Sequence, residues 1–167
     1  YNLSSNNSVR LNTWNEMARN VHRNLTSLTK KKKKAVNKFV AAANIPEGSS
    51  EETTIELLED YMKNKINIDE KLVSENAENV EASIKSGNTN NFGASRLMIA
   101  MLEAKGIRYQ AVFPSVRNQL PLVEELENWN RIEEMILYFP STKKFLQPNS
   151  VILRYTFVDA YWTAKRG

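Results

Sequence analysis

The stretch that decides the fold runs Asn91-Phe92-Gly93-Ala94-Ser95-Arg96-Leu97-Met98-Ile99-Ala100-Met101-Leu102-Glu103-Ala104-Lys105-Gly106-Ile107. Its apolar residues 97–102 surround a helix axis almost completely, which predicts burial on most sides. We expect the helix over residues 92–105, because the Asn-rich loop 88–91 offers capping residues before it and Gly106 ends it. This segment is therefore the predicted central helix of the core.

Further helices are predicted before this segment. Apolar residues recur at intervals of three and four over residues 11–28, and a second stripe occupies 36–43, so we expect two helices or one long bent helix. Residues 49–52, Ser-Ser-Glu-Glu, have the form of a capping box, in which a serine and a glutamate three residues later satisfy free backbone N–H groups. A third helix should follow, and a weaker helical pattern over 74–85 should end at Gly87.

The hydrophobic period changes after the central helix. Residues 109–113 and 135–139 are short β-branched and aromatic runs bounded by prolines, which predicts two strands, and a weaker pattern indicates another at 154–157. The polar connection over 115–130 is long, and such loops are often functional. Helices followed by a small sheet indicate an α+β fold, with the central helix buried against an antiparallel sheet.

The composition limits the chemistry that the chain can perform. Its 167 residues, 41% hydrophobic and 25% charged, are typical of one folded domain. The chain contains no cysteine and one histidine, His22, which excludes thiolate zinc sites and cysteine nucleophiles and argues against a histidine-rich metal centre. We therefore expect no metal and no cofactor.

The chain is expected to be a piece of a longer protein. It begins Tyr-Asn-Leu-Ser, without an initiator methionine or a signal-peptide pattern, and no apolar run is long enough to span a membrane. We expect one domain over 1–167, excised from a multidomain chain, with N-terminal helices over 1–48 and the core over 49–167.

Positive charge is concentrated in one run. The formal net charge is +4, and five consecutive residues are basic: Lys30, Lys31, Lys32, Lys33 and Lys34. The simpler interpretation is a solvated helix face, and the alternative is an anion-binding module that uses these lysines. Nucleic acid is not the expected partner, because no aromatic or arginine side chains that would read it accompany the run.

The order of the segments resembles a known family. Four segments, taken in order, resemble the core of the bacterial transglutaminase-like superfamily. They are the stretch 91–107, the strand after it, Glu134-Met135-Ile136-Leu137-Tyr138-Phe139-Pro140 and Phe145-Leu146-Gln147-Pro148. Upstream, Trp14 and residues 56–66 resemble the helices of members that follow a β-sandwich in large secreted bacterial proteins. The resemblance implies a cysteine-protease-like core and an extracytoplasmic location, in the periplasm or at the cell surface.

The catalytic residues of that family are absent. In the family a cysteine opens the central helix, a histidine opens a later strand and an aspartate follows on the next segment, and these positions carry Asn91, Glu134 and Gln147 here. An asparagine amide is not a useful nucleophile, and a glutamine cannot carry the orienting charge. The resemblance therefore implies a pseudoenzyme with no catalytic residues, in which Asn91 serves as a helix N-cap.

Three functional hypotheses follow. The first is a non-catalytic module that binds a peptide, a glycan or a neighbouring domain through the old cleft, or acts as a scaffold. Residues expected to line that cleft are Phe92, Arg96, Trp129 and Tyr138, and Arg96 would hold an acidic group or pair with its neighbours. The second is an enzyme with a rebuilt site that uses Glu134, and the third is the anion-binding module of the lysine run.

Overall fold

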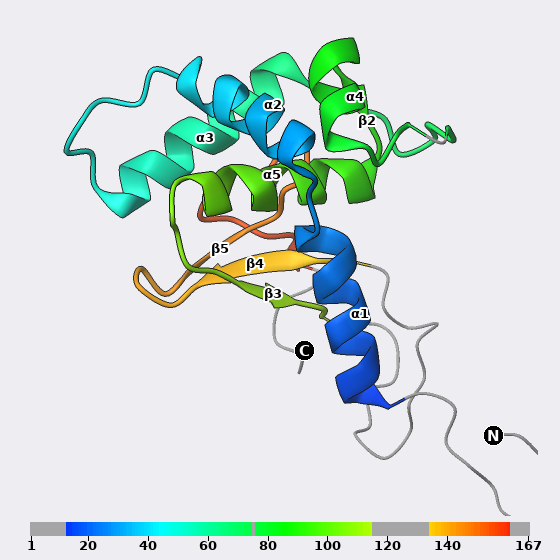
Figure 1. The fold of residues 1–167 in the computed structure, drawn as a ribbon. Helices are drawn as coiled ribbons and strands as arrows, with labels where there is room; N and C mark the ends of the chain where they lie inside the picture. Colours follow the sequence, from blue (N-terminus) through cyan, green and yellow to red (C-terminus); the bar gives the residue numbers. More distant parts are fainter. Residues whose placement is uncertain (1–12, 75, 115–133, 161–167) are drawn as a thin grey trace, which may run out of the picture.

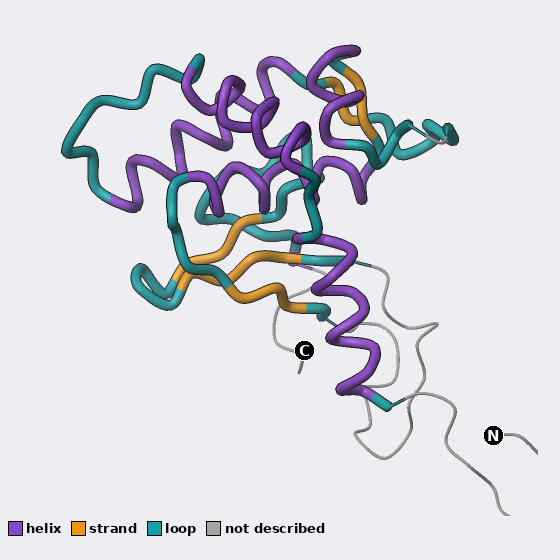
Figure 2. The backbone as a smooth tube through the Cα atoms, viewed as in Figure 1, coloured by secondary structure: helices purple, strands orange, loops and turns teal. Residues whose placement is uncertain are grey.

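The fold combines a layer of helices with a small antiparallel sheet. The computed structural model describes residues 13–74, 76–114 and 134–160. Figure 1 shows α5 (Asn91–Ala104) between the three-stranded sheet and three helices: α2 (Lys30–Ala41), α3 (Glu51–Lys65) and α4 (Val80–Ser86). Along the chain, α1 to α5 precede the three strands of this sheet (Figure 2), so the predicted α+β class is confirmed.

Two separate helices form the first part of the described chain. Helix α1 (Trp14–Thr26) begins with a capping box between Thr13 and Glu16. Helix α2 (Lys30–Ala41) begins after Thr29, whose side chain accepts from the backbone N–H of Lys32. The lysine run therefore lies inside α2, and the alternative of one long bent helix is wrong.

Helix α3 (Glu51–Lys65) begins differently from the prediction. Its N-cap is Ser50, which accepts from the backbone N–H of Thr53 at 3.1 Å, so residues 49–52 do not form a capping box. The two first-turn glutamates are used elsewhere. Glu51 accepts from Ser141 and Glu52 pairs with Lys144, which joins the start of α3 to the hairpin of β4 (Ile136–Phe139) and β5 (Lys144–Leu146).

A two-stranded parallel ladder links α3 to the central helix. Strand β1 (Asn67–Ile68) pairs with β2 (Asn88–Thr89), and α4 (Val80–Ser86) lies between them in the chain. The left-handed Gly87, at φ +71°, ends α4 as predicted, because glycine adopts this backbone conformation without steric cost. The helical pattern predicted over 74–85 is realised only from Val80 onward.

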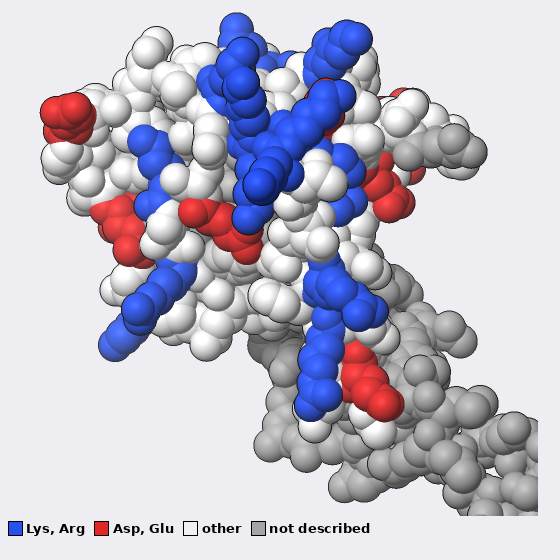
Figure 3. All heavy atoms as spheres, in the orientation of Figure 1, with Lys and Arg blue, Asp and Glu red and all other residues white. Residues whose placement is uncertain are grey.

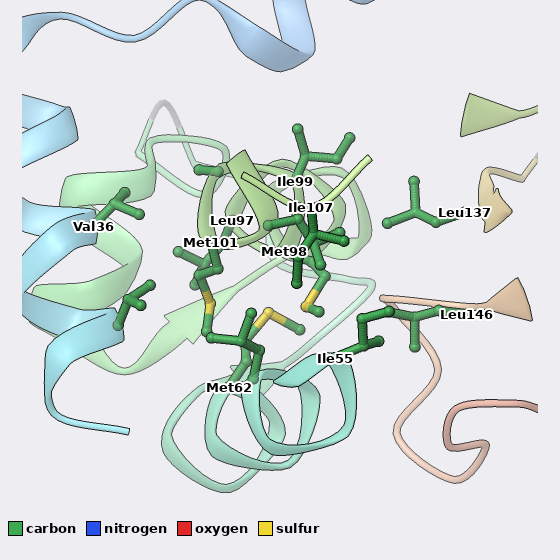
Figure 4. Close-up of a cluster of buried hydrophobic side chains, with 14 of the residues drawn as sticks. Val36, Ile55, Met62, Leu97, Met98, Ile99, Met101, Ile107, Leu137 and Leu146 are labelled. Carbon is green, nitrogen blue, oxygen red and sulfur yellow. The ribbon is translucent and has the colours of Figure 1, made fainter. Parts of the chain in front are cut away.

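The central helix α5 is buried along most of its length, as its composition predicts. Each of the residues 97–102 is at most 3% exposed. Figure 4 shows side chains of α2, α3 and the sheet around them, including Val36, Ile55, Met62, Leu137 and Leu146. Burial of such a side chain contributes about 1.5–3 kcal/mol, so α5 organises the core.

The start of α5 packs closely against the preceding loop and β2. Its N-cap is Asn90, whose side chain accepts from the backbone N–H of Gly93 at 2.9 Å. A Cβ atom at Gly93 would collide with Thr89 Oγ1 and the carbonyl oxygen of Ala77. Only glycine fits there, which holds the first turn of α5 against its neighbours.

The second sheet is a three-stranded meander. Strand β4 (Ile136–Phe139) pairs antiparallel with both β3 (Gln110–Val112) and β5 (Lys144–Leu146). The strand expected over 154–157 is reduced to one isolated bridge between Phe145 and Thr156. The connection predicted over 115–130 lies outside the described residues. Within the described ranges, no helix has the length and apolarity needed to cross a bilayer.

Candidate functional site

Glu134 and Gln147 meet at one edge of the sheet. Glu134 lies just before β4 and Gln147 directly follows β5, and because these strands are antiparallel, the start of one adjoins the end of the other. Gln147 Nε2 donates to Glu134 Oε2 at 3.3 Å. The structure therefore brings together two of the three positions that the family resemblance singles out.

A third side chain completes this cluster, which we call the carboxylate brace: Glu134, Gln147 and Asn149. Asn149 Nδ2 donates to both oxygens of Glu134 at 3.0 Å. The backbone N–H of Met135 donates to Glu134 Oε1 at 2.8 Å. Each carboxylate oxygen thus receives two donors, and an ionised carboxylate has about four lone-pair sites. All of its acceptor sites are occupied within the protein.

Gln147 is fixed on its other side as well. It is 7% exposed, and its Oε1 accepts from the backbone N–H of Asp159 at 3.2 Å. Its backbone oxygen accepts from Lys63 Nζ at 3.2 Å. Gln147, at the position that the resemblance matches to the family's aspartate, is therefore held in a buried network, and its neutral amide carries no charge to orient a histidine.

Asn91 is the first residue of α5 and does not join this network. In the described chain, no hydrogen bond connects it to Glu134 or Gln147. The N-cap function expected of Asn91 belongs to its neighbour Asn90, because Asn90 has the extended backbone that precedes the helix. In Figure 1, α5 and β4 both begin at the side of the molecule opposite the β4–β5 hairpin.

An open depression lies beside the first turns of α5. Its volume is about 510 Å³, and it is lined by Arg23, Asn24, Ser27, Glu78, Phe92 and Arg96. Arg96 Nη1 donates to the carbonyl oxygen of Glu78 at 3.3 Å, and its Nη2 donates to that of Ser27 at 3.1 Å. Arg96 therefore ties the end of α1 to the loop before α4 and does not pair with Glu103.

Tyr138, which was also expected to line a cleft, is not among the residues that line this depression. Tyr138 lies on β4, and its ring centroid is 5.0 Å from that of Phe145 on the neighbouring strand. Trp129 lies outside the described residues. Of the four predicted cleft residues, the structure thus places Phe92 and Arg96 together and Tyr138 in the sheet.

A buried ion pair beneath the brace was not predicted. Lys63 Nζ lies 2.6 Å from Glu59 Oε1, and the two side chains are only 2% and 3% exposed. Lys63 also donates to the carbonyl oxygen of Leu153 at 2.8 Å, and Glu59 Oε2 accepts from the backbone N–H of Tyr155 at 2.7 Å. These contacts, with the bond to Gln147, connect α3 to the segment after β5.

Burial shifts the pKa of Lys63. Removal from water lowers the pKa of Lys63 below its ordinary value, and the hydrogen bond and charge of Glu59 oppose that decrease. The sequence carries one signal of the pair, since Glu59 and Lys63 are four residues apart on a helix. That spacing is common on exposed helix faces, so it does not reveal burial.

The described residues contain no ready-made metal site. Among the described residues, no group of three histidine, cysteine, aspartate or glutamate side chains could hold a metal ion. Comparison with protein-family models, curated proteins and solved structures finds no match. The functional interpretation therefore depends on the chain's own residues and on their geometry.

Proposed function

We propose that this chain is a non-catalytic transglutaminase-like module, a pseudoenzyme with a binding or structural role. The order of its elements supports this, because a buried central helix precedes an antiparallel sheet. The contact between Glu134 and Gln147 supports it further, since the family resemblance assigns the histidine and aspartate positions to these residues. An extracytoplasmic location belongs to the same proposal.

The saturated carboxylate of Glu134 is the observation that carries the proposal. A catalytic base needs a lone pair directed at the proton that it removes. Both oxygens of Glu134 instead accept from Met135, Gln147 and Asn149. The cluster joins the start of β4 to the segment after β5, which is a structural task.

The alternative of an enzyme that uses Glu134 receives less support. A rebuilt active site needs a nucleophile or an activated water beside the base, together with room for a substrate. The described neighbours of the Glu134 carboxylate are amide and backbone N–H donors, none of which is a nucleophile. A partner would more readily contact the depression at Phe92 and Arg96, where a peptide, a glycan or an adjacent domain of the same chain would meet polar side chains.

The test compares the native chain with Glu134→Gln and with Glu56→Gln as a control at an exposed glutamate. Each protein is incubated with a fluorescent primary amine and a glutamine-containing peptide, and separately with the peptide alone. The proposal predicts no amine incorporation and no hydrolysis by any of them. Turnover by the native chain that disappears in E134Q but persists in E56Q would establish the enzyme instead.

The free energy of unfolding of E134Q tests the structural role of Glu134 directly. In E134Q one carboxylate oxygen becomes an NH2 group that faces the amide donors of Gln147 and Asn149. Loss of charged hydrogen bonds and an unpaired buried donor should lower the free energy of unfolding by about 1–3 kcal/mol. E56Q should change it by less than about 0.5 kcal/mol. An E134Q protein as stable as the native chain would contradict the structural role.

A further inference from the structure

The lysine run forms a continuous cationic row on the outside of α2. Lys30, Lys34 and Lys38 are spaced by four residues and are all exposed, so they lie in one row along the helix. With a rise of 1.5 Å per residue, this row is about 12 Å long. Figure 3 shows blue side chains gathered over α1 and α2 on the face turned to the viewer. The opposite face of α2 is buried through Val36, Phe39 and Val40.

This arrangement works against the stability of the helix. The first turn of α2 contains no acidic residue, although the helix dipole favours negative charge there. Like charges four residues apart, such as Lys30 and Lys34, repel each other. One acid compensates: Glu81 on α4 lies 2.8 Å from Lys31 Nζ. The other lysines of the run form no ion pair with any described residue, so folding alone gives no reason for their concentration.

The composition of the row narrows the kind of partner. Lysine ammonium groups are point charges without the planar geometry that arginine uses to read bases. The exposed residues of α2 are lysines, Asn37 and Ala41, with no aromatic ring for a base to stack on. Because the apolar face of α2 is buried in the core, the helix has no side chains left to insert into hydrocarbon. The contact that it can make is electrostatic and lies at a surface.

We propose that the lysine row of α2, which is Lys30, Lys34 and Lys38, together with the exposed Lys33 beside it, binds the surface of an anionic phospholipid bilayer. A planar array of lipid phosphates complements an exposed row of ammonium groups, and clusters of four or more lysines on a helix are typical of such contacts. The chain lies on the surface and does not enter the hydrocarbon. This inference is independent of the proposed transglutaminase-like function, since it uses no residue of the brace.

The experiment measures binding of the 167-residue chain to vesicles of phosphatidylcholine alone and to vesicles with equal parts of phosphatidylcholine and phosphatidylglycerol. The native chain should bind only the anionic vesicles, and binding should disappear between about 0.05 and 0.5 M salt. Each lysine contributes about a five-fold increase in affinity. K30Q/K33Q/K34Q/K38Q should therefore lower the partition coefficient by roughly 100-fold or more.

A matched control separates the row from total charge. K65Q/K71Q/K105Q/R108Q removes the same charge from exposed positions outside α2 and should keep most of the binding. K30R/K33R/K34R/K38R keeps the charge and should bind as the native chain does. Circular dichroism checks that each variant is folded. If the glutamine variant does not fold, the proposal is judged by vesicle binding of the arginine variant and by the salt dependence of binding by the native chain.

Three outcomes would overturn the inference. The first is no binding of the native chain to anionic vesicles at low salt. The second is equal loss in the α2 variant and in the control, which would indicate a response to net charge alone. The third is tight binding to duplex or single-stranded DNA without vesicle binding, which would make nucleic acid the partner.

Discussion

Replacing Lys63 with methionine should destabilise the protein more than any surface substitution on the same helix. Lys63 Nζ donates to Glu59 Oε1, to the carbonyl oxygen of Gln147 and to that of Leu153. Methionine has a similar length and no donor. In K63M the buried Glu59 carboxylate keeps only the N–H of Tyr155, and two backbone carbonyls lose a donor.

The magnitude follows from what remains unpaired. Removing one partner of a buried ion pair lowers the free energy of unfolding by about 3–5 kcal/mol, because the other charge stays buried without compensation. A small domain has a total stability of about 5–15 kcal/mol, so K63M should lose a substantial share of it. The double variant K63M/E59L removes the orphaned charge and should recover at least about 1 kcal/mol relative to K63M. It should not reach the native value, since the N–H of Tyr155 loses its acceptor and the carbonyl oxygens of Gln147 and Leu153 still lack a donor.

Urea unfolding at pH 7, followed by circular dichroism, measures these differences. Lys65→Met is the matched control, because Lys65 is exposed in the last turn of the same helix. It should change the free energy of unfolding by less than about 0.5 kcal/mol. A loss below about 1 kcal/mol in K63M, or a double variant that is no more stable than K63M, would refute the assignment of a buried, compensated pair.

Three further perturbations have defined outcomes. The pKa of Lys63 is lower in the folded protein than its ordinary value of 10.5, so between these two pKa values the unfolded chain binds more protons than the folded one. The free energy of unfolding of the native protein, measured in urea, should therefore rise with pH in this range more steeply than that of K63M. The same pH dependence in both proteins would contradict the prediction. Gly93→Ala should lower the free energy of unfolding in urea by about 1–3 kcal/mol, because the added methyl group collides with the carbonyl oxygen of Ala77. An unchanged free energy of unfolding would show that the loop moves to accommodate the methyl group. Burial, and to a smaller extent the neighbouring Glu103, raises the pKa of Tyr109 in the folded protein. The neutral Tyr109 hydroxyl therefore stabilises the fold fully below about pH 10, and this contribution is lost as the pH rises further. Y109F should weaken that alkaline loss, and an unchanged pH profile would exclude Tyr109 as its source.

The sequence was most informative where its pattern had one interpretation. The central helix was predictable because residues 97–102 are apolar on every side, and α5 is the helix that all the other helices contact. Its cap was displaced by one residue, since Asn90 and Asn91 are equally good capping residues. The start of α2 was missed for another reason: the lysine run has no apolar period, and the cap of Thr29 carried the signal.

The candidate site was predictable only in part. The sequence indicated a relation between Glu134 and Gln147 only through the family resemblance, because β5, whose pairing with β4 brings the two residues together, was not predicted as a strand. Asn149 was missed because a turn after β5 brings it back to Glu134, and no local pattern encodes that return. The buried pair of Glu59 and Lys63 was missed because its burial depends on a segment about 90 residues away in the chain.

The most direct test of the central claim is the ionisation of a thiol placed at the start of α5. N91C introduces the only cysteine in the chain, and N91C/E134H/Q147D adds the other two groups of the family. The pH dependence of alkylation by iodoacetamide gives the thiol pKa in each protein. The transglutaminase-like assignment predicts a lower pKa in the triple variant than in N91C, because a nearby imidazolium stabilises the thiolate. The same pKa of about 8.5 in both proteins would contradict the assignment of these three positions to one former catalytic site.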